Sequence, residues 1–115
     1  MPFYDIAVIG GGHAGIEAAS IASRFGIRTA LITLSKGKTG YPSCNPSIGG
    51  IAKSHLVYEL DVFGSAMPAA ADASSVHSKL LNSSKGPAVW SLREQIDSEA
   101  YPREVLKMLS SSLTL

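Results

Sequence analysis

Cysteine and long apolar runs are scarce in this sequence. Cys44 is the single cysteine among 115 residues, so an internal disulfide framework is excluded and a reducing compartment is favoured. No apolar run approaches the roughly 20 residues that a membrane-spanning helix needs. The start, MPFYDIAVIGGG, lacks a basic segment and reaches glycine too early for a signal peptide. These absences predict a cytoplasmic chain.

Net charge is also nearly absent, at +1 from ten basic and nine acidic residues. A total charge this small favours neither a nucleic acid nor a membrane surface as partner, although it is compatible with a local basic patch. The composition is 45% hydrophobic and 17% charged, which is typical of a globular chain. The length suffices for one small domain with a core of its own.

The first 34 residues contain a strand–helix–strand pattern. Residues 3–9 form a short apolar run, which predicts a buried strand, and residues 27–34 predict a second one. Between them, Gly26 stands where a helix C-cap glycine belongs. Apolar residues recur at helical spacing before it, at Ala14, Ala18, Ile21, Ala22 and Phe25. The pattern predicts a βαβ unit with parallel strands, and hence a doubly wound, Rossmann-like α/β fold.

The next segment carries turn signals and then a second helical pattern. Residues 35–50 are predicted as a loop, which at this length is usually functional. Gly64 ends the predicted second helix. Its predicted apolar face consists of Ala52, Leu56, Leu60 and Phe63.

The last third of the chain gives weaker signals. Residues 65–75 are small and polar and predict a loop, whereas residues 76–81 predict a short strand. Residues 91–109 have a helical tendency. We expect a break there, or a new helix starting near Pro102, because a proline in a helix interior costs about 3 kcal/mol.

Gly10, Gly12 and Gly15 form a G-x-G-x-x-G pattern between the first strand and the first helix. The first glycine permits a tight turn, the second lets a pyrophosphate approach the backbone, and the third lets the helix pack closely on the strand. The phosphates would then lie at the helix N-terminus, which favours anions. The pattern predicts dinucleotide binding; the alternative is a turn needed only for tight packing.

The acidic residue that usually follows about 20 positions later is missing. The sequence at that place contains Thr33, Ser35 and Lys36. Hydroxyl groups of Thr33 or Ser35 could substitute for the carboxylate, and Lys36 could favour a 2′-phosphate. The spacing alone therefore leaves FAD, NAD and NADP open.

Two further residues are candidates for chemistry. Cys44 lies in YPSCNPSIGG, ahead of the second helix, and a thiol near a helix N-terminus can act as a nucleophile. A buried, inert cysteine is the alternative. His13 lies inside the glycine turn, where it could contact a cofactor or point to solvent. His55 and His77 complete no metal-ligand spacing with them, so no metal site is predicted.

The segment NSSKGPAVWSLREQID offers one more possible anion contact. Its KGP turn could place Lys85 near an anion, or could be a solvated basic turn. Trp90 is interpreted as either a core anchor or a stacking surface.

Three motifs together resemble the GidA/MnmG family of FAD-dependent tRNA uridine 5-carboxymethylaminomethyl modification enzymes. They are IGGGHAGIEAA, SCNPSIGGIAKSHLVYELDVFG and LNSSKGPAVWSLREQID, and the resemblance spans residues 4–101. The glycine motif occurs in many flavoproteins, whereas the other two in this order are far more specific.

The resemblance implies FAD bound through the glycine turn and a catalytic role for Cys44, which matches the family's S-C-N-P cysteine. The implied cofactor-binding residues are Gly10, Gly12, His13, Ala14 and Gly15. Family members act with an MnmE-type GTPase, and use methylenetetrahydrofolate and glycine or ammonium to modify the wobble uridine of certain tRNAs. The resemblance also implies a homodimer for the full-length protein.

The family enzymes are several times longer than this chain. Residues 1–115 are therefore interpreted as the N-terminal part of an incomplete, Rossmann-like FAD-binding domain, with the family's other domains absent. Two alternatives remain at this point. The chain could be a non-catalytic fragment with at most weak nucleotide binding, or part of another FAD-dependent oxidoreductase.

Overall fold

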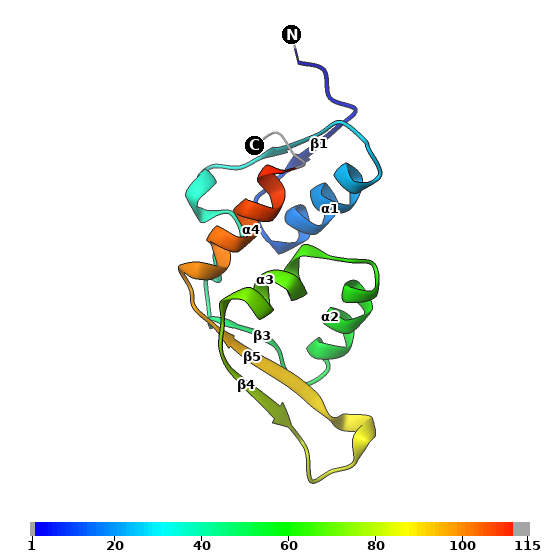
Figure 1. Ribbon diagram of the computed structural model, residues 1–115, viewed down its shortest axis with the longest axis vertical. Helices are drawn as coiled ribbons and strands as arrows, with labels where there is room; N and C mark the ends of the chain where they lie inside the picture. The colour runs from blue at the N-terminus through cyan, green and yellow to red at the C-terminus, as the bar shows by residue number, and fades with distance from the viewer. Residues whose placement is uncertain (1, 112–115) are drawn as a thin grey trace.

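A computed structural model describes residues 2–111 of the chain as an elongated body of 58 × 26 × 19 Å (Figure 1). Met1 and residues 112–115 of the expected 1–115 domain lie outside the described residues. The elements in chain order are β1 (Ile6–Ile9), α1 (His13–Arg24), β2 (Thr29–Ile32), the 3-10 helix η1 (Lys36–Lys38), β3 (Ser47–Gly49), α2 (Lys53–Val62), α3 (Ala66–Ser74), β4 (Ser75–Leu81), the 3-10 helix η2 (Pro87–Val89), β5 (Ser91–Ile96) and α4 (Ala100–Ser110).

The predicted βαβ unit is confirmed. Strands β1 and β2 pair in parallel, with Ile6 opposite Thr29 and Ile9 opposite Ile32. The helix between them ends as predicted, since Gly26 adopts a φ of +77° and its N–H donates to the carbonyl of Ser23 at 2.9 Å. The α/β fold class inferred from the sequence is therefore correct.

The hydrophobic core lies where α1, α3 and α4 meet. Its fully buried members are Ile16, Ala19, Leu31, Ala66, Ala70, Ala71, Ile96, Tyr101, Val105 and Leu109. The many alanines allow the helices to approach one another closely. The buried face of α1 consists of Ile16, Ala19 and Ala22. Of the five apolar positions noted in the sequence, only Ala22 is buried, so the spacing predicted the helix but not its buried face.

Side chains of α1 also form hydrogen bonds with backbone groups at the ends of two other helices. The Glu17 carboxylate accepts hydrogen bonds from the N–H groups of Ala66 and Met67, at 3.2 and 2.8 Å, and so caps the start of α3. The Arg24 guanidinium donates to the carbonyls of Phe63 and Gly64 after the end of α2. These contacts fix the α2–α3 junction against α1.

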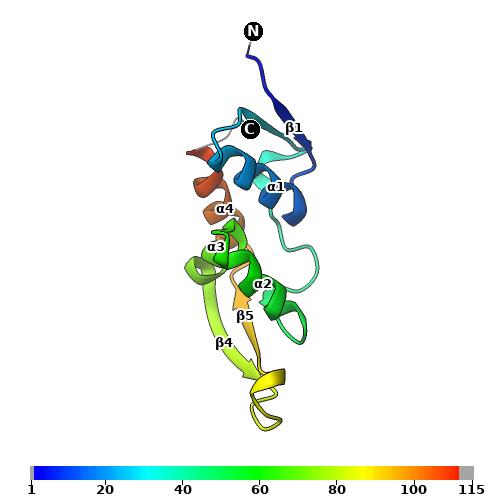
Figure 2. The ribbon, with the colours of Figure 1, turned by 90° about the vertical axis from the view of Figure 1, so that its right-hand side faces the viewer.

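The second sheet is antiparallel, in the order β3-β5-β4, and its hairpin of β4 and β5 extends away from the helices in both views (Figures 1 and 2). The predicted strand at residues 76–81 is confirmed as β4. Helices α2 and α3 pack on one face of this sheet, against Ile48 and Leu92. The opposite face of the sheet has no helix on it among the described residues.

Two predictions for the later chain need correction. Residues 65–75, predicted as a loop, contain α3, because alanine-rich sequence favours helix and Pro68 falls in the first turn, where its missing N–H costs nothing. Residues 91–96, predicted as helical, form β5, whose backbone hydrogen bonds come from β3 and β4. The predicted helix restart near Pro102 is confirmed, since α4 begins at Ala100.

Two finer expectations were also wrong. The loop predicted over residues 35–50 contains η1 and β3. The apolar face predicted for α2 is not part of the core of the described residues, since Leu56 is 61% exposed and Phe63 70% exposed. Within residues 2–111, no helix combines the length and the apolar character needed to cross a membrane.

Candidate functional site

The glycine turn joins β1 to α1 in a way that explains two of its glycines from the protein alone. Gly10 has a φ of +116°, a left-handed conformation that favours glycine. A Cβ at Gly15 would overlap the carbonyl oxygen of Gly10, so this glycine allows the helix to approach the turn. Gly11, which the sequence analysis did not single out, is also needed, because its Cβ would lie 2.7 Å from the Thr33 hydroxyl oxygen.

Gly12 differs from these glycines because nothing in the protein lies within 4 Å of the position of a Cβ there. Its φ of −78° is one that any residue can adopt. The protein's own packing therefore gives no reason for a glycine at this position. The open space lies at the N-terminus of α1, where Ile16 makes the first helical hydrogen bond, to the Gly12 carbonyl at 3.0 Å.

The start of α1 is suited to an anion. The N–H groups of residues 13–15 precede the first helical hydrogen bond, and no side chain caps this end. The first turn also contains no acidic residue. Free N–H groups, the helix dipole and the space beside Gly12 together fit the pyrophosphate of a dinucleotide such as FAD.

The end of β2 lies beside this turn. Thr33 is half-buried against Gly11, and its hydroxyl donates to the Ser35 carbonyl at 3.4 Å. Ser35 and Lys36 are exposed. Thr33, at the place where the usual carboxylate is missing, is therefore close to the glycine turn, as the strand–helix–strand pattern requires.

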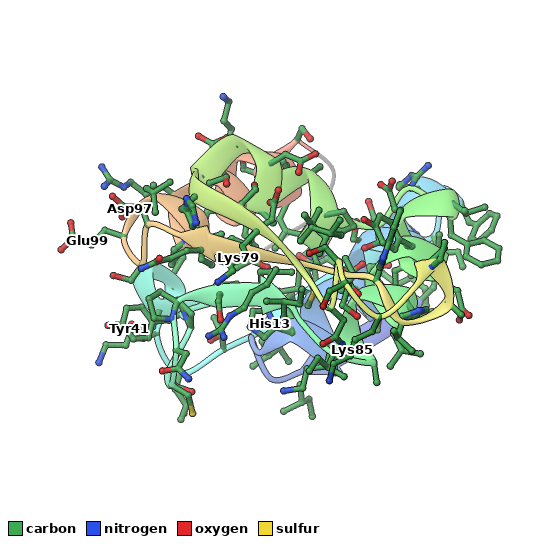
Figure 3. The ribbon with its side chains drawn as sticks, turned by 90° about the horizontal axis from the view of Figure 1, so that it is seen from below. His13, Tyr41, Lys79, Lys85, Asp97 and Glu99 are labelled. Carbon is green, nitrogen blue, oxygen red and sulfur yellow. The ribbon has the colours of Figure 1, made fainter. Side chains whose placement is uncertain are left out.

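His13 is the first residue of α1 and is half-buried (Figure 3). Its ring meets the buried ring of Tyr101 edge to face, with 5.8 Å between the centroids and 66° between the planes. Burial lowers the pKa of His13 below its usual range, although Glu17 opposes this effect. The imidazole is therefore neutral at pH 7 and retains one donor and one acceptor nitrogen.

Cys44 is exposed and lines a cavity of about 540 Å³. Strand β3 lies between this cysteine and α2 in the sequence, and the cavity also reaches Lys53, the first residue of α2. The cavity joins Cys44 to His13 of the glycine turn and to Gly50 before α2. All three sequence motifs thus line one cavity, since Leu81 and Arg93 of the third motif also belong to its lining.

Two cations in this cavity were missed by the sequence analysis. Lys53 begins α2, and Arg93 reaches the cavity from β5, where its guanidinium donates to the Ser47 hydroxyl at 3.4 Å. Lys53 stands within the motif that begins at Ser43, which was the available signal. Arg93 stands within the third motif, LNSSKGPAVWSLREQID, but its place in this cavity depends on the pairing of β5 with β3.

The remaining candidates lie elsewhere. Lys85 is exposed in the turn of the β4–β5 hairpin. Trp90 is not in the core, since it is 42% exposed, and its Nε1–H donates to the Ser83 carbonyl at 3.2 Å. His55 and His77 are exposed, and the described residues contain no group of three or more potential metal ligands.

Comparison with known proteins places this arrangement in a family. The sequence profile described as Glucose inhibited division protein A matches residues 5–115. The chain belongs to this family. The GidA family assignment extends over both the glycine turn and the Cys44 loop.

Several curated relatives agree with the assignment. The tRNA uridine 5-carboxymethylaminomethyl modification enzyme MnmG of Zymomonas mobilis is 48% identical over 113 residues, which are 98% of this chain and 18% of the relative. The mouse mitochondrial 5-taurinomethyluridine-[tRNA] synthase subunit MTO1 is 49% identical over 111 residues, 96% of this chain and 17% of that protein. The chain thus spans less than a fifth of these relatives.

Solved structures support the fold. Aquifex aeolicus GidA in its form I crystal superposes with a TM-score of 0.93 at 45% identity, covering 96% of this chain and 18% of that one. Thermovibrio ammonificans THI4 superposes with a TM-score of 0.53 at 18% identity over 96% of this chain and 36% of its own, which is a likeness of fold alone.

Proposed function

We propose that this chain is the N-terminal, FAD-binding portion of a tRNA wobble-uridine modification enzyme that introduces the 5-carboxymethylaminomethyl group. The observation that carries the proposal is the cavity shared by the glycine turn and the Cys44 loop. Family membership supports the reaction class, since the curated relatives are tRNA modification enzymes. On this proposal, residues 1–115 belong to one Rossmann-like FAD-binding domain.

The glycine turn has the properties that FAD binding requires. Gly10 and Gly15 shape the turn, and Gly12 leaves the space that a pyrophosphate would occupy. The N–H groups of His13, Ala14 and Gly15 would donate to its oxygens. When bound, the flavin supplies redox chemistry that protein side chains lack.

The chain's own residues would act on the substrate side of the cavity. Cys44 is an exposed thiol that can serve as a nucleophile toward the uracil ring once deprotonated. Lys53 and Arg93 line the same cavity and favour an anion over a cation beside Cys44. His13, neutral at pH 7, can orient a bound group by hydrogen bonding without adding charge.

The complete enzyme would need partners beyond this chain. We propose that it acts in the cytoplasm with an MnmE-type GTPase, as a homodimer. Its other substrates would be methylenetetrahydrofolate and glycine or ammonium. The family assignment supports these proposals, and the tRNA modification activity of the curated relatives supports tRNA as the macromolecular substrate.

The experiment that tests this proposal replaces Gly12 by valine in a full-length family enzyme carrying these residues as its N-terminal segment. The added side chain enters the space beside the helix N-terminus, where its Cβ would have no protein atom within 4 Å. We expect loss of the flavin absorbance and of tRNA modification. The apo protein should lose at most about 1 kcal/mol of stability, because position 12 is an N-cap.

Gly37→Val is the matched control. Gly37 also has nothing within 4 Å of a Cβ and no left-handed φ, and it lies in η1 outside the glycine turn. This variant should keep its flavin. Full flavin content in Gly12→Val would show that Gly12 has no role in cofactor binding and would remove the main structural support for the proposal.

A further inference from the structure

The cavities on the open face of the β3-β5-β4 sheet are lined by cations and by no carboxylate. A second cavity, of about 340 Å³, lies on this face and is lined by His77, Lys79, Arg93 and Gln95 together with loop residues 45–47. It shares Arg93 and Ser47 with the Cys44 cavity. Neither cavity has an aspartate or glutamate among its lining residues.

Three acidic residues near this sheet lie on its other face. Glu94 alternates with Arg93 along β5 and accepts a hydrogen bond from Ser78 at 2.9 Å. Together with Asp61 and Asp72 it lines the cavity under α2 and α3, which contains no lysine or arginine. The sheet therefore separates charges of opposite sign, although the chain as a whole has a net charge of only +1.

Two of the cations oppose one another directly. Lys79 of β4 and Arg93 of β5 are cross-strand partners, so their side chains emerge side by side on the open face. Like charges in this arrangement destabilise a sheet. Neither residue has an ion-pair partner within residues 2–111. An anion between them would turn this repulsion into attraction.

The shape of the surface favours an extended anion over a small one. Lys79 and Arg93 are exposed on neighbouring strands, and Lys85 is exposed in the turn that joins these strands. Figure 3 shows Lys79 on the side of the ribbon turned toward His13. Lys53 adds a cation at the N-terminus of α2, whose dipole is also positive there. Open positive tracks of this kind bind the backbone of single-stranded nucleic acids.

We infer that the open face of this sheet, through Lys79 and Arg93, binds backbone phosphates of the RNA whose base enters the Cys44 cavity. The inference rests on the proposed function, because it assigns the contacts that hold the same substrate. The shared walls of the two cavities place a nucleotide's phosphate next to Arg93 when its base lies near Cys44. Phosphate contacts of this kind set position and affinity rather than sequence preference.

The test measures binding of an anticodon stem-loop RNA to the full-length enzyme at several salt concentrations, by fluorescence anisotropy. The variants are Lys79→Gln, Arg93→Gln and the double variant. Each single change should weaken binding roughly three- to tenfold and reduce the slope of log affinity against log salt by about 1. Flavin content should not change.

Lys107→Gln is the charge-matched control, because Lys107 is an exposed lysine on α4, away from both cavities. It should leave the affinity and the salt slope unchanged. The RNA-free Lys79→Gln protein should melt at the same temperature as the parent or slightly higher, since a like-charge pair is removed. A purely structural role for Lys79 predicts lower melting instead.

Three outcomes would overturn the inference. An unchanged salt slope in the double variant would show that no phosphate is bound there. Loss of flavin in these variants would show that Lys79 and Arg93 bind the cofactor. Weaker binding of methylenetetrahydrofolate with normal RNA binding would show that they bind this small anion instead. Failure of the proposed function is distinct, since the parent enzyme would then bind neither flavin nor RNA.

Discussion

At the scale of single residues, the glycines of the turn differ in what they serve. Gly15 is required by the fold, because a Cβ there would overlap the Gly10 carbonyl, whereas the space at Gly12 is open. Both positions belong to one motif, yet only the glycine at position 12 needs a bound ligand to explain it. Substitutions at the two positions should therefore fail in different ways.

Gly15→Ala should destabilise the protein itself. The helix must move away from the turn to accommodate the methyl group, at a cost of about 1–3 kcal/mol. The thermal unfolding midpoint of the flavin-free enzyme measures this effect. Gly37→Ala, whose Cβ meets nothing, should leave the midpoint unchanged. Equal midpoints for the two variants would contradict the close approach of α1 to Gly10.

Cys44→Ser should separate chemistry from packing. The Cys44 side chain is exposed, so replacing sulfur by oxygen should leave the unfolding midpoint and the flavin content unchanged. We expect tRNA modification by the full-length enzyme to fall at least about a hundredfold, because a serine hydroxyl is a far weaker nucleophile at neutral pH. Ser84→Ala, which removes an exposed hydroxyl in the β4–β5 turn, is the control. Normal modification by Cys44→Ser would leave the thiol without a catalytic role.

At the scale of elements, capping by distant or flanking side chains determines several boundaries. Asp97 precedes α4, and its carboxylate accepts hydrogen bonds from the N–H groups of Glu99 and Ala100 at 2.8 and 2.9 Å. These hydrogen bonds hold the pKa of Asp97 below its usual value, and the bond from Ala100 has the larger effect. The stabilisation that the charged carboxylate gives is therefore present above pH of about 4 and is lost as the pH falls further.

Asp97→Asn tests this dependence on pH. The variant should melt at a lower temperature than the parent at pH 7, and the two melting temperatures should converge as the pH falls below about 4. Glu59→Gln, an exposed carboxylate within α2, is the control and should show a small difference with no such convergence. A constant gap between Asp97→Asn and the parent would mean that the charge of Asp97 does not matter.

The sequence predicted those elements whose causes are local. The turn at Gly10, the cap at Gly26 and the restart near Pro102 follow from backbone conformations that each residue type allows or forbids. The longest segments missed were α3 and β5. The first hydrogen bonds of α3 depend on Glu17, and the strand at Ser91–Ile96 depends on partners from two other segments.

The same division applies to the candidate site. Cys44 and His13 stand in motifs that can be read along the chain. Arg93 and Lys79 enter the site only through the register of β5 with its neighbours, which no local pattern specifies. Sequence reasoning therefore found the residues proposed for cofactor and nucleophile but missed those inferred to hold the substrate.

At the scale of the whole molecule, the described residues expose much apolar surface. Ile9 is 84% exposed and Val62 84% exposed, and Leu34 is fully exposed. The β1–β2 sheet has two strands, with both outer edges unpaired among the described residues. Such surfaces promote association. A helix N-terminus alone contributes only about 0.3–2 kcal/mol to anion binding.

These 115 residues expressed by themselves should therefore be poorly soluble, bind little or no flavin and modify no tRNA, even with the GTPase, folate and glycine supplied. Flavin absorbance of the purified protein and a wobble-uridine assay measure both expectations. The full-length enzyme is the positive control in the same assay. A yellow, active, monomeric product would show that the segment is sufficient by itself.

The capping of α3 by Glu17 also has a consequence for biosynthesis. Helix α3 has no capping side chain of its own at Ser65, and its donor groups find their acceptor 49 and 50 residues earlier in the chain. Closing a loop of this length costs only slightly more than closing one half as long. Because the ribosome releases the N-terminus first, α1 has already emerged when α3 is made. The order of translation thus supplies α3 after α1, the helix on which its first turn depends.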